Sequence, residues 1–78
     1  MTTEMSNPNI IARSIVDRKY VVSTVRLLSS PSFETMVFPC DEQGTVTDWI
    51  ELDCQQYRTL DEARAGHSDM VQNWTNRS

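Results

Sequence analysis

The sequence contains few of the residues from which metal centres and nucleophilic sites are usually built. It has one histidine, His67, and two cysteines, Cys40 and Cys54. Structural zinc sites take their ligands from spaced pairs of cysteine and histidine, and these three residues show no such spacing. A nucleophilic Cys–His pair would also need a third group to orient the histidine. The sequence therefore predicts no metal, no cofactor and no catalytic residues, and we expect a protein that is not an enzyme.

Long apolar runs and an excess of positive charge are lacking as well. No apolar stretch approaches the ~20 residues that a helix needs to span a bilayer. The opening MTTEMSNPN has neither the basic nor the apolar part of a signal peptide, so we expect a cytoplasmic protein with reduced thiols. Seven Lys and Arg residues stand against eleven Asp and Glu residues, for a net charge of −4. This balance argues against a general nucleic-acid binder, which needs basic surface.

What the sequence does contain is a turn with clear chemistry in residues 33–53. Asp41 can accept hydrogen bonds from the backbone that follows it, and Gly44 can adopt positive φ, as in a type I turn with a G1 bulge. This turn predicts a β-hairpin in which Asp41 faces Thr45 and Cys40 faces Val46. Continued outward, the register places one set of side chains on each face of the sheet.

The two faces of the predicted hairpin differ in composition. One carries Met36, Phe38, Ile50 and Leu52, and we assign it to the core beneath a helix. The other carries Phe33 and Val37, with Trp49 directly opposite Val37. The assignment depends on the turn, because a slip of one residue would exchange the faces.

A strand is predicted before the hairpin and a helix after it. Residues 19–28 are rich in β-branched side chains and should pair antiparallel with 33–40, while 46–54 form the third strand. Thr59 and Glu62 have the spacing of a capping box. An apolar stripe then repeats every three or four residues and should lie on the sheet: Leu60, Ala63, His67, Met70, Val71 and Trp74.

Two residues of this predicted helix call for a structural explanation. We expect His67 to fill the interface between helix and sheet, with one ring nitrogen bonded to a carbonyl group. Gly66 costs up to about 1 kcal/mol relative to alanine within a helix, and a close approach to the sheet would account for it.

The expected fold is α+β, a three-stranded antiparallel β-meander packed by one C-terminal α-helix. Residues 19–75 make up this single domain. Residues 1–18 precede it as an N-terminal arm or a short helix, for which Asn7 is a candidate cap with Pro8 in the first turn.

Three separated blocks carry a resemblance. They are YVVSTVRL (20–27), FETMVFP (33–39) followed by Asp48 and Trp49, and TLDEARAGH (59–67) followed by Val71 and Trp74. Together they resemble a group of small uncharacterised accessory proteins of tailed bacteriophages. The resemblance covers about residues 19–75, with 1–18 as an extension. It implies a phage-encoded protein in the cytoplasm of the host cell and implies no particular activity.

With a single helix, one face of the sheet has no covering element unless residues 1–18 fold over it. Both arrangements are open. Exposed aromatic residues on such a face often anchor protein interfaces. The residues that we predict to contact a partner are Phe33, Val37 and Trp49 in the hairpin and Ile10, Ile11 and Ile15 in the N-terminal segment.

These features support several functional hypotheses. The first is a small phage protein that binds a host or phage protein, such as a host-takeover or anti-defence inhibitor. The second is a virion decoration or minor structural protein that docks through residues 1–18. An edge strand could also pair with a partner strand or with a second copy of the chain, giving a homo-oligomer. A third class is sequestration of a small ligand at such an oligomer interface. Neither nucleic acid nor a membrane is an expected partner.

Overall fold

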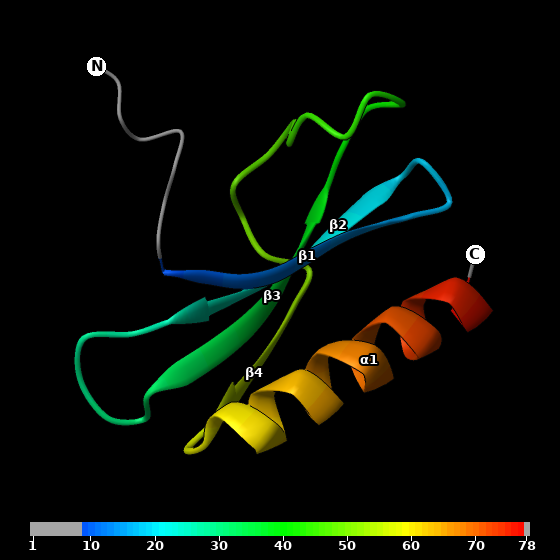
Figure 1. The fold of residues 1–78 in the computed structure, drawn as a ribbon. Coiled ribbons are helices and arrows are strands. Elements are labelled where there is room, and N and C mark those ends of the chain that lie inside the picture. Colours follow the sequence, from blue (N-terminus) through cyan, green and yellow to red (C-terminus); the bar gives the residue numbers. More distant parts are fainter. Residues whose placement is uncertain (1–8, 78) are drawn as a thin grey trace.

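A computed structural model describes residues 9–77, and the predicted cap at Asn7 lies outside them. The elements are β1 (Ile10–Val16), β2 (Tyr20–Arg26), β3 (Phe33–Pro39), β4 (Asp53–Tyr57) and α1 (Leu60–Arg77). The strands form one antiparallel sheet in the order β1-β2-β3-β4, and α1 lies across one face of it (Figure 1). The predicted α+β class is confirmed. The predicted number of strands is wrong, because the sheet has four.

The additional strand is β1, in the segment predicted as an arm or a short helix. Asp17 and Arg18 have φ values of 52° and 55°, and the Lys19 amide donates to the Val16 carbonyl over 3.0 Å. Positive φ at both central residues is the mark of a type I′ turn, which joins two strands tightly. Because this turn reverses the chain, residues 10–16 pair with β2 instead of forming a helix.

Strand β1 is an edge strand with an irregularity near its start. Ile10 pairs with Val25, whereas Ala12 pairs with Thr24, so Ile11 is an extra residue in the ladder. Such a bulge twists the strand locally and interrupts its hydrogen-bonding edge.

The predicted turn is confirmed. The Asp41 carboxylate accepts from the amides of Gln43 and Thr45, both over 2.9 Å. Gly44 has a φ of 86°, and Cys40 pairs with Val46 across the turn. The local chemistry of an aspartate and a glycine was therefore sufficient to specify this reversal.

The predicted third strand over 46–54 is wrong for residues 48–52, although the Thr47 amide still donates to the Pro39 carbonyl over 3.0 Å as the register predicts. The Asp48 carboxylate accepts from the Ile50 amide over 3.0 Å, and this local turn competes with the strand for the backbone. Pairing with β3 resumes only near β4, where Asp53 faces Val37 in place of the predicted Trp49. Residues 40–52 instead form the connection between β3 and β4, which we call the 40–52 loop.

The assignment of the sheet faces is also wrong. The core beneath α1 contains Val16, Val22, Val37, Met70 and Trp74. Met36 and Phe38, which alternate with Val37 along β3, lie on the opposite face. Apolar residues occur on both faces because α1 covers one and the 40–52 loop crosses the other. Composition alone could not distinguish them.

The predicted helix is confirmed, including its cap. The Glu62 amide donates to the Thr59 hydroxyl over 3.1 Å, and the Glu62 carboxylate accepts from the Thr59 amide over 3.3 Å. The buried stripe consists of Ala63, Gly66, His67, Met70 and Trp74. No helix within residues 9–77 is long and apolar enough to cross a membrane.

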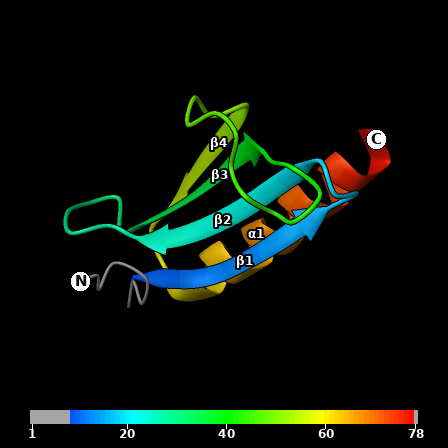
Figure 2. The same ribbon diagram turned by 90° about the horizontal axis from the view of Figure 1, so that it is seen from above.

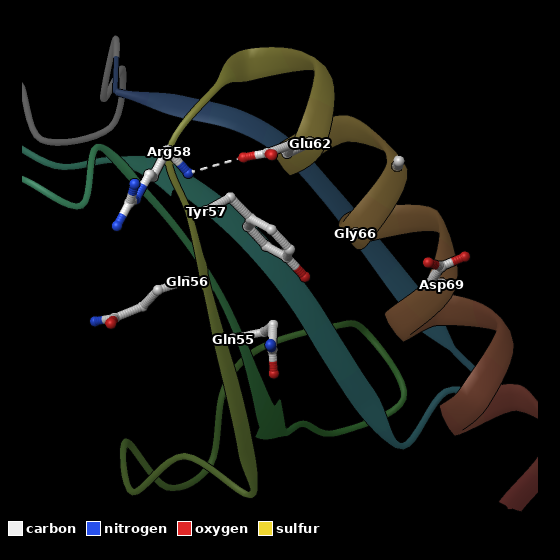
Figure 3. Close-up of a pocket in the computed structure, with 8 residues that line it drawn as sticks. Gln55, Gln56, Tyr57, Arg58, Glu62, Gly66 and Asp69 are labelled. Atoms are coloured by element: carbon white, nitrogen blue, oxygen red, sulfur yellow. Dashed lines mark hydrogen bonds between the residues drawn. The ribbon is translucent and has the colours of Figure 1, made fainter.

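The predicted close approach at Gly66 is confirmed. The ring of Tyr57 extends from β4 to the helix beside Gly66 (Figure 3), and a methyl group at Gly66 would overlap the Tyr57 ring and hydroxyl. Overpacking of this kind costs about 1–3 kcal/mol, whereas alanine gains up to about 1 kcal/mol in helix propensity.

Gly66→Ala should therefore lower the free energy of unfolding by about 1–2 kcal/mol, measured by urea denaturation. Ser68→Ala, at an exposed position of the same helix, is the control and should change it by less than about 0.5 kcal/mol. A Gly66→Ala protein as stable as the wild type would show that Tyr57 does not constrain this position.

Candidate functional site

The 40–52 loop folds back over the face of the sheet opposite α1. Figure 2 shows it crossing in front of β2 and β1, with the helix behind them. The Arg13 guanidinium holds the loop by donating from Nη2 to the Gly44 carbonyl over 2.7 Å. Gly44 is buried and rests against Ile15, where an added methyl group would overlap the isoleucine side chain. The loop is thus fixed to β1 at its tip.

Between this loop and the sheet lies an apolar groove of about 380 Å³, which we call the outer groove. Its lining is mostly aliphatic and aromatic, with one charged side chain, and comes from three strands and the loop: Ile10, Arg13, Val21, Ser23, Val25, Met36, Phe38, Val46 and Trp49. Concave apolar surfaces with a few polar groups are typical of binding sites.

Trp49 stands at the edge of the outer groove. Its ring packs edge-on against Phe38 at a centroid distance of 5.2 Å, yet 73% of the residue is exposed. An indole held on one side by another ring and open to solvent on the other is a suitable anchor for a protein interface.

The structure separates the residues predicted to contact a partner. Ile10 lines the outer groove with Trp49, and Ile15 is exposed nearby on the same strand. Ile11 is half-buried at the bulge. Phe33 and Val37 are only 4% and 0% exposed. These two are core residues and are not available to a partner.

Two exposed residues of the 40–52 loop were missed. Ile50 is 74% exposed and Leu52 is 48% exposed. Together with Trp49 they form an apolar series interrupted by acidic residues, in the sequence DWIELD (48–53). The alternation of apolar and acidic residues is a signal for an exposed segment. The predicted strand register instead assigns Ile50 and Leu52 to the core.

A second groove lies between β4 and α1. It measures about 630 Å³ and is lined largely by polar side chains, among them Gln55, Arg58, Glu62 and Asp69. Figure 3 shows these residues around Tyr57. The Glu62 carboxylate is already engaged in capping, since it accepts from the Arg58 amide over 3.2 Å. This groove offers fewer apolar contacts than the outer groove.

The buried histidine belongs to a network of hydroxyl groups beneath α1. His67 Nδ1 lies 2.7 Å from Thr24 Oγ1, and His67 Nε2 lies 2.9 Å from Ser14 Oγ. Thr24 Oγ1 in turn shares a hydrogen bond with Thr35 Oγ1. The predicted place of His67 is confirmed, but its partners are hydroxyl groups and not a carbonyl.

The Ser14–His67 contact has the geometry of a nucleophile and its base, but its surroundings favour a structural role. The second ring nitrogen meets the neutral hydroxyl of Thr24, whereas a catalytic triad places a carboxylate there to stabilise the imidazolium. Burial lowers the pKa of His67 below its ordinary value of 6.5. The imidazole is therefore held neutral between helix and sheet.

The lowered pKa of His67 gives the stability of the protein a pH dependence. In the unfolded chain the imidazole takes up its proton near pH 6.5, while the folded chain resists protonation to lower pH. The unfolded state therefore binds more protons as the pH falls, and the free energy of unfolding decreases below about pH 6.5. We expect urea midpoints to fall between about pH 7.5 and about pH 5.5, less so in His67→Asn, which removes the titrating group. An equal fall in both proteins would contradict this.

Both cysteines are free, and their thiols are poor nucleophiles. Cys54 Sγ donates to a Glu34 carboxylate oxygen over 3.1 Å. Burial and this carboxylate raise the pKa of Cys54 to about 12. Burial, with the charge of Asp41, also raises the pKa of Cys40. Since the thiolate is the reactive form, neither residue is activated for catalysis.

The comparisons with known proteins leave the outer groove as the main guide to function. The chain matches no family model, no curated protein and no solved structure. Within residues 9–77, no group of three or more His, Cys, Asp or Glu side chains is arranged to hold a metal ion.

Proposed function

We propose that the protein is a non-enzymatic binding protein that attaches to another protein through the outer groove and the exposed part of the 40–52 loop. In this proposal it is a phage-encoded inhibitor or accessory factor that acts on a host or phage protein in the host cytoplasm. The observation that carries the proposal is the exposure of Trp49 and Ile50 beside an apolar groove.

The arrangement of these residues supports an interface. An exposed apolar surface of this kind costs solubility unless a partner covers it. The bonds of Asp41 to Thr45 and of Arg13 to Gly44 hold residues 41–45 against β1, and the bond from the Ile50 amide to the Asp48 carboxylate sets the backbone of the exposed part. Preorganisation lowers the entropic cost of association.

Affinity capture from infected bacterial cells tests the proposal. Tagged wild-type protein should retain a specific protein, and Trp49→Ala should reduce its capture at least ~10-fold, the loss typical of a central aromatic contact. Purification of the captured protein and titration against both variants then gives the affinity change directly. Equal affinity of the wild type and Trp49→Ala for the captured protein would show that Trp49 does not contribute to the interface.

A matched control tests whether capture depends on this surface or on any exposed apolar side chain. Leu28 is 100% exposed in the connection between β2 and β3, outside the outer groove. Leu28→Ala should leave capture unchanged. If Leu28→Ala reduces capture as much as Trp49→Ala does, binding is non-specific and the proposed surface is wrong.

A further inference from the structure

We infer that this surface binds a second copy of the chain, in a symmetric dimer. Residues 48–52 of each copy would pack into the outer groove of the other. The inference rests on the proposed function, because it names a partner for the same surface.

The segment that would be inserted is displayed outward. Trp49 and Ile50 are about three-quarters exposed and Leu52 about half. The Asp48 carboxylate accepts from the Ile50 amide, which fixes the backbone where Ile50 projects. This short segment therefore presents large apolar side chains in a set geometry, as an interface knob requires.

The groove that would receive it has matching chemistry. Val25, Met36 and Phe38 provide apolar walls, and the cavity of about 380 Å³ lies within the size range of binding pockets. Its single charge comes from Arg13. This guanidinium donates to a neutral carbonyl, and it makes no ion pair with any carboxylate in the part of the chain that the structure describes.

Charge complementarity favours a second copy as the occupant. The inserted segment interleaves its apolar residues with Asp48 and Glu51, so it would bring carboxylates to the Arg13 of the other copy. A chain with a net charge of −4 repels its own copies in most orientations. An orientation that places Glu51 near Arg13 is therefore selected over the others.

The positions of groove and segment suit a two-fold axis. The groove lies on the sheet face opposite α1, and Trp49 belongs both to the groove and to the inserted segment. When two such faces meet about a two-fold axis, each segment reaches the groove of its partner, and the same contact is made twice. The interface is then closed to further copies of the chain, and self-assembly stops at the dimer.

Sedimentation of the full chain over about 1 µM to about 1 mM tests the dimer. Wild type should dimerise with increasing concentration. Ile50→Asp, which puts a charge on the inserted side chain, should raise the dissociation constant at least ~10-fold. Leu28→Asp, at an exposed site outside the surface, should match wild type. A monomeric wild type, or an Ile50→Asp protein that dimerises equally well, would overturn the inference.

A charge reversal tests the pairing. Glu51→Arg places a like charge against the Arg13 of the other copy while leaving the bond from Arg13 to Gly44 intact, so it should dimerise at least ~10-fold more weakly than the wild type. A Glu51→Arg protein that dimerises as tightly as the wild type would exclude the Arg13–Glu51 contact. If the wild type is monomeric and Trp49→Ala still loses its captured protein, the dimer is wrong and the proposed function stands.

Discussion

Replacing Trp74 with alanine is expected to lower the free energy of unfolding by about 3–5 kcal/mol, the usual cost of removing a buried tryptophan. Trp74 is 7% exposed and its ring packs edge-on against Tyr20 at 4.9 Å. Its indole nitrogen donates to the Asp53 carboxylate over 3.0 Å, so the same side chain joins α1 to both β2 and β4. A loss of this size is comparable to the whole stability of many domains of this length.

The control for this prediction is the same substitution on the other face of the sheet. Trp49→Ala removes a ring that is mostly exposed and that contacts Phe38 at its edge. It should change the free energy of unfolding by less than about 1 kcal/mol. Urea denaturation followed by far-ultraviolet circular dichroism measures both. Similar losses for the two variants would mean that the 40–52 loop is part of the core, and loss of binding in Trp49→Ala would then have a trivial cause.

Thr24→Val is expected to lower the free energy of unfolding by about 2–4 kcal/mol even though it preserves the shape of the side chain. Thr24 is fully buried, and its hydroxyl is shared by His67 Nδ1 and Thr35 Oγ1. Valine leaves His67 Nδ1 without a partner and leaves the Thr35 hydroxyl with Tyr57 alone. The cost of an unsatisfied buried polar group, about 1–3 kcal/mol each, is larger than the value of the hydrogen bond itself.

Two further variants test this explanation. Thr47→Val makes the same change at an exposed position and should shift the free energy of unfolding by less than about 0.5 kcal/mol. Thr35→Val removes the hydrogen bonds of Thr35 to both Thr24 and Tyr57, so it should cost about as much as Thr24→Val. If Thr24→Val is as stable as the wild type, the hydroxyl network contributes only packing.

The parts of the fold that could be predicted from sequence are those decided by neighbouring residues. The capping box of Thr59 and Glu62 and the turn between Asp41 and Gly44 depend on contacts within four positions, and both are specified by side chains that favour one local geometry. The apolar stripe of α1 followed from its period.

The parts that could not be predicted depend on competition between local and distant contacts. The turn at Asp17 and Arg18 lacks the asparagine and glycine that usually mark positive φ, so β1 was not recognised as a strand. The chain leaves the predicted third strand at Asp48. The sequence does not indicate this, because the apolar residues Trp49, Ile50 and Leu52 are typical of a strand that continues.

Of the residues predicted to contact a partner, Trp49, Ile10 and Ile15 are exposed, and their contact with a partner stays a prediction. Trp49 packs on Phe38, on the sheet face opposite the one predicted for it. Phe33 and Val37 are buried because the two faces are interchanged, and the residues of β3 that line the outer groove are Met36 and Phe38. The cavity itself depends on the bond between Arg13 and Gly44, which joins positions distant in sequence.

The bulge between Ile10 and Ala12 bears on how the protein behaves at high concentration. Because Ile11 interrupts the ladder, the open edge of β1 cannot offer a long regular row of amides and carbonyls to another chain. The opposite edge, β4, has only five residues, with exposed glutamines at its centre. Neither edge is a good template for continued strand addition. Concentrated solutions should therefore remain free of fibrils, even though an exposed tryptophan and isoleucine lie on the face between these edges.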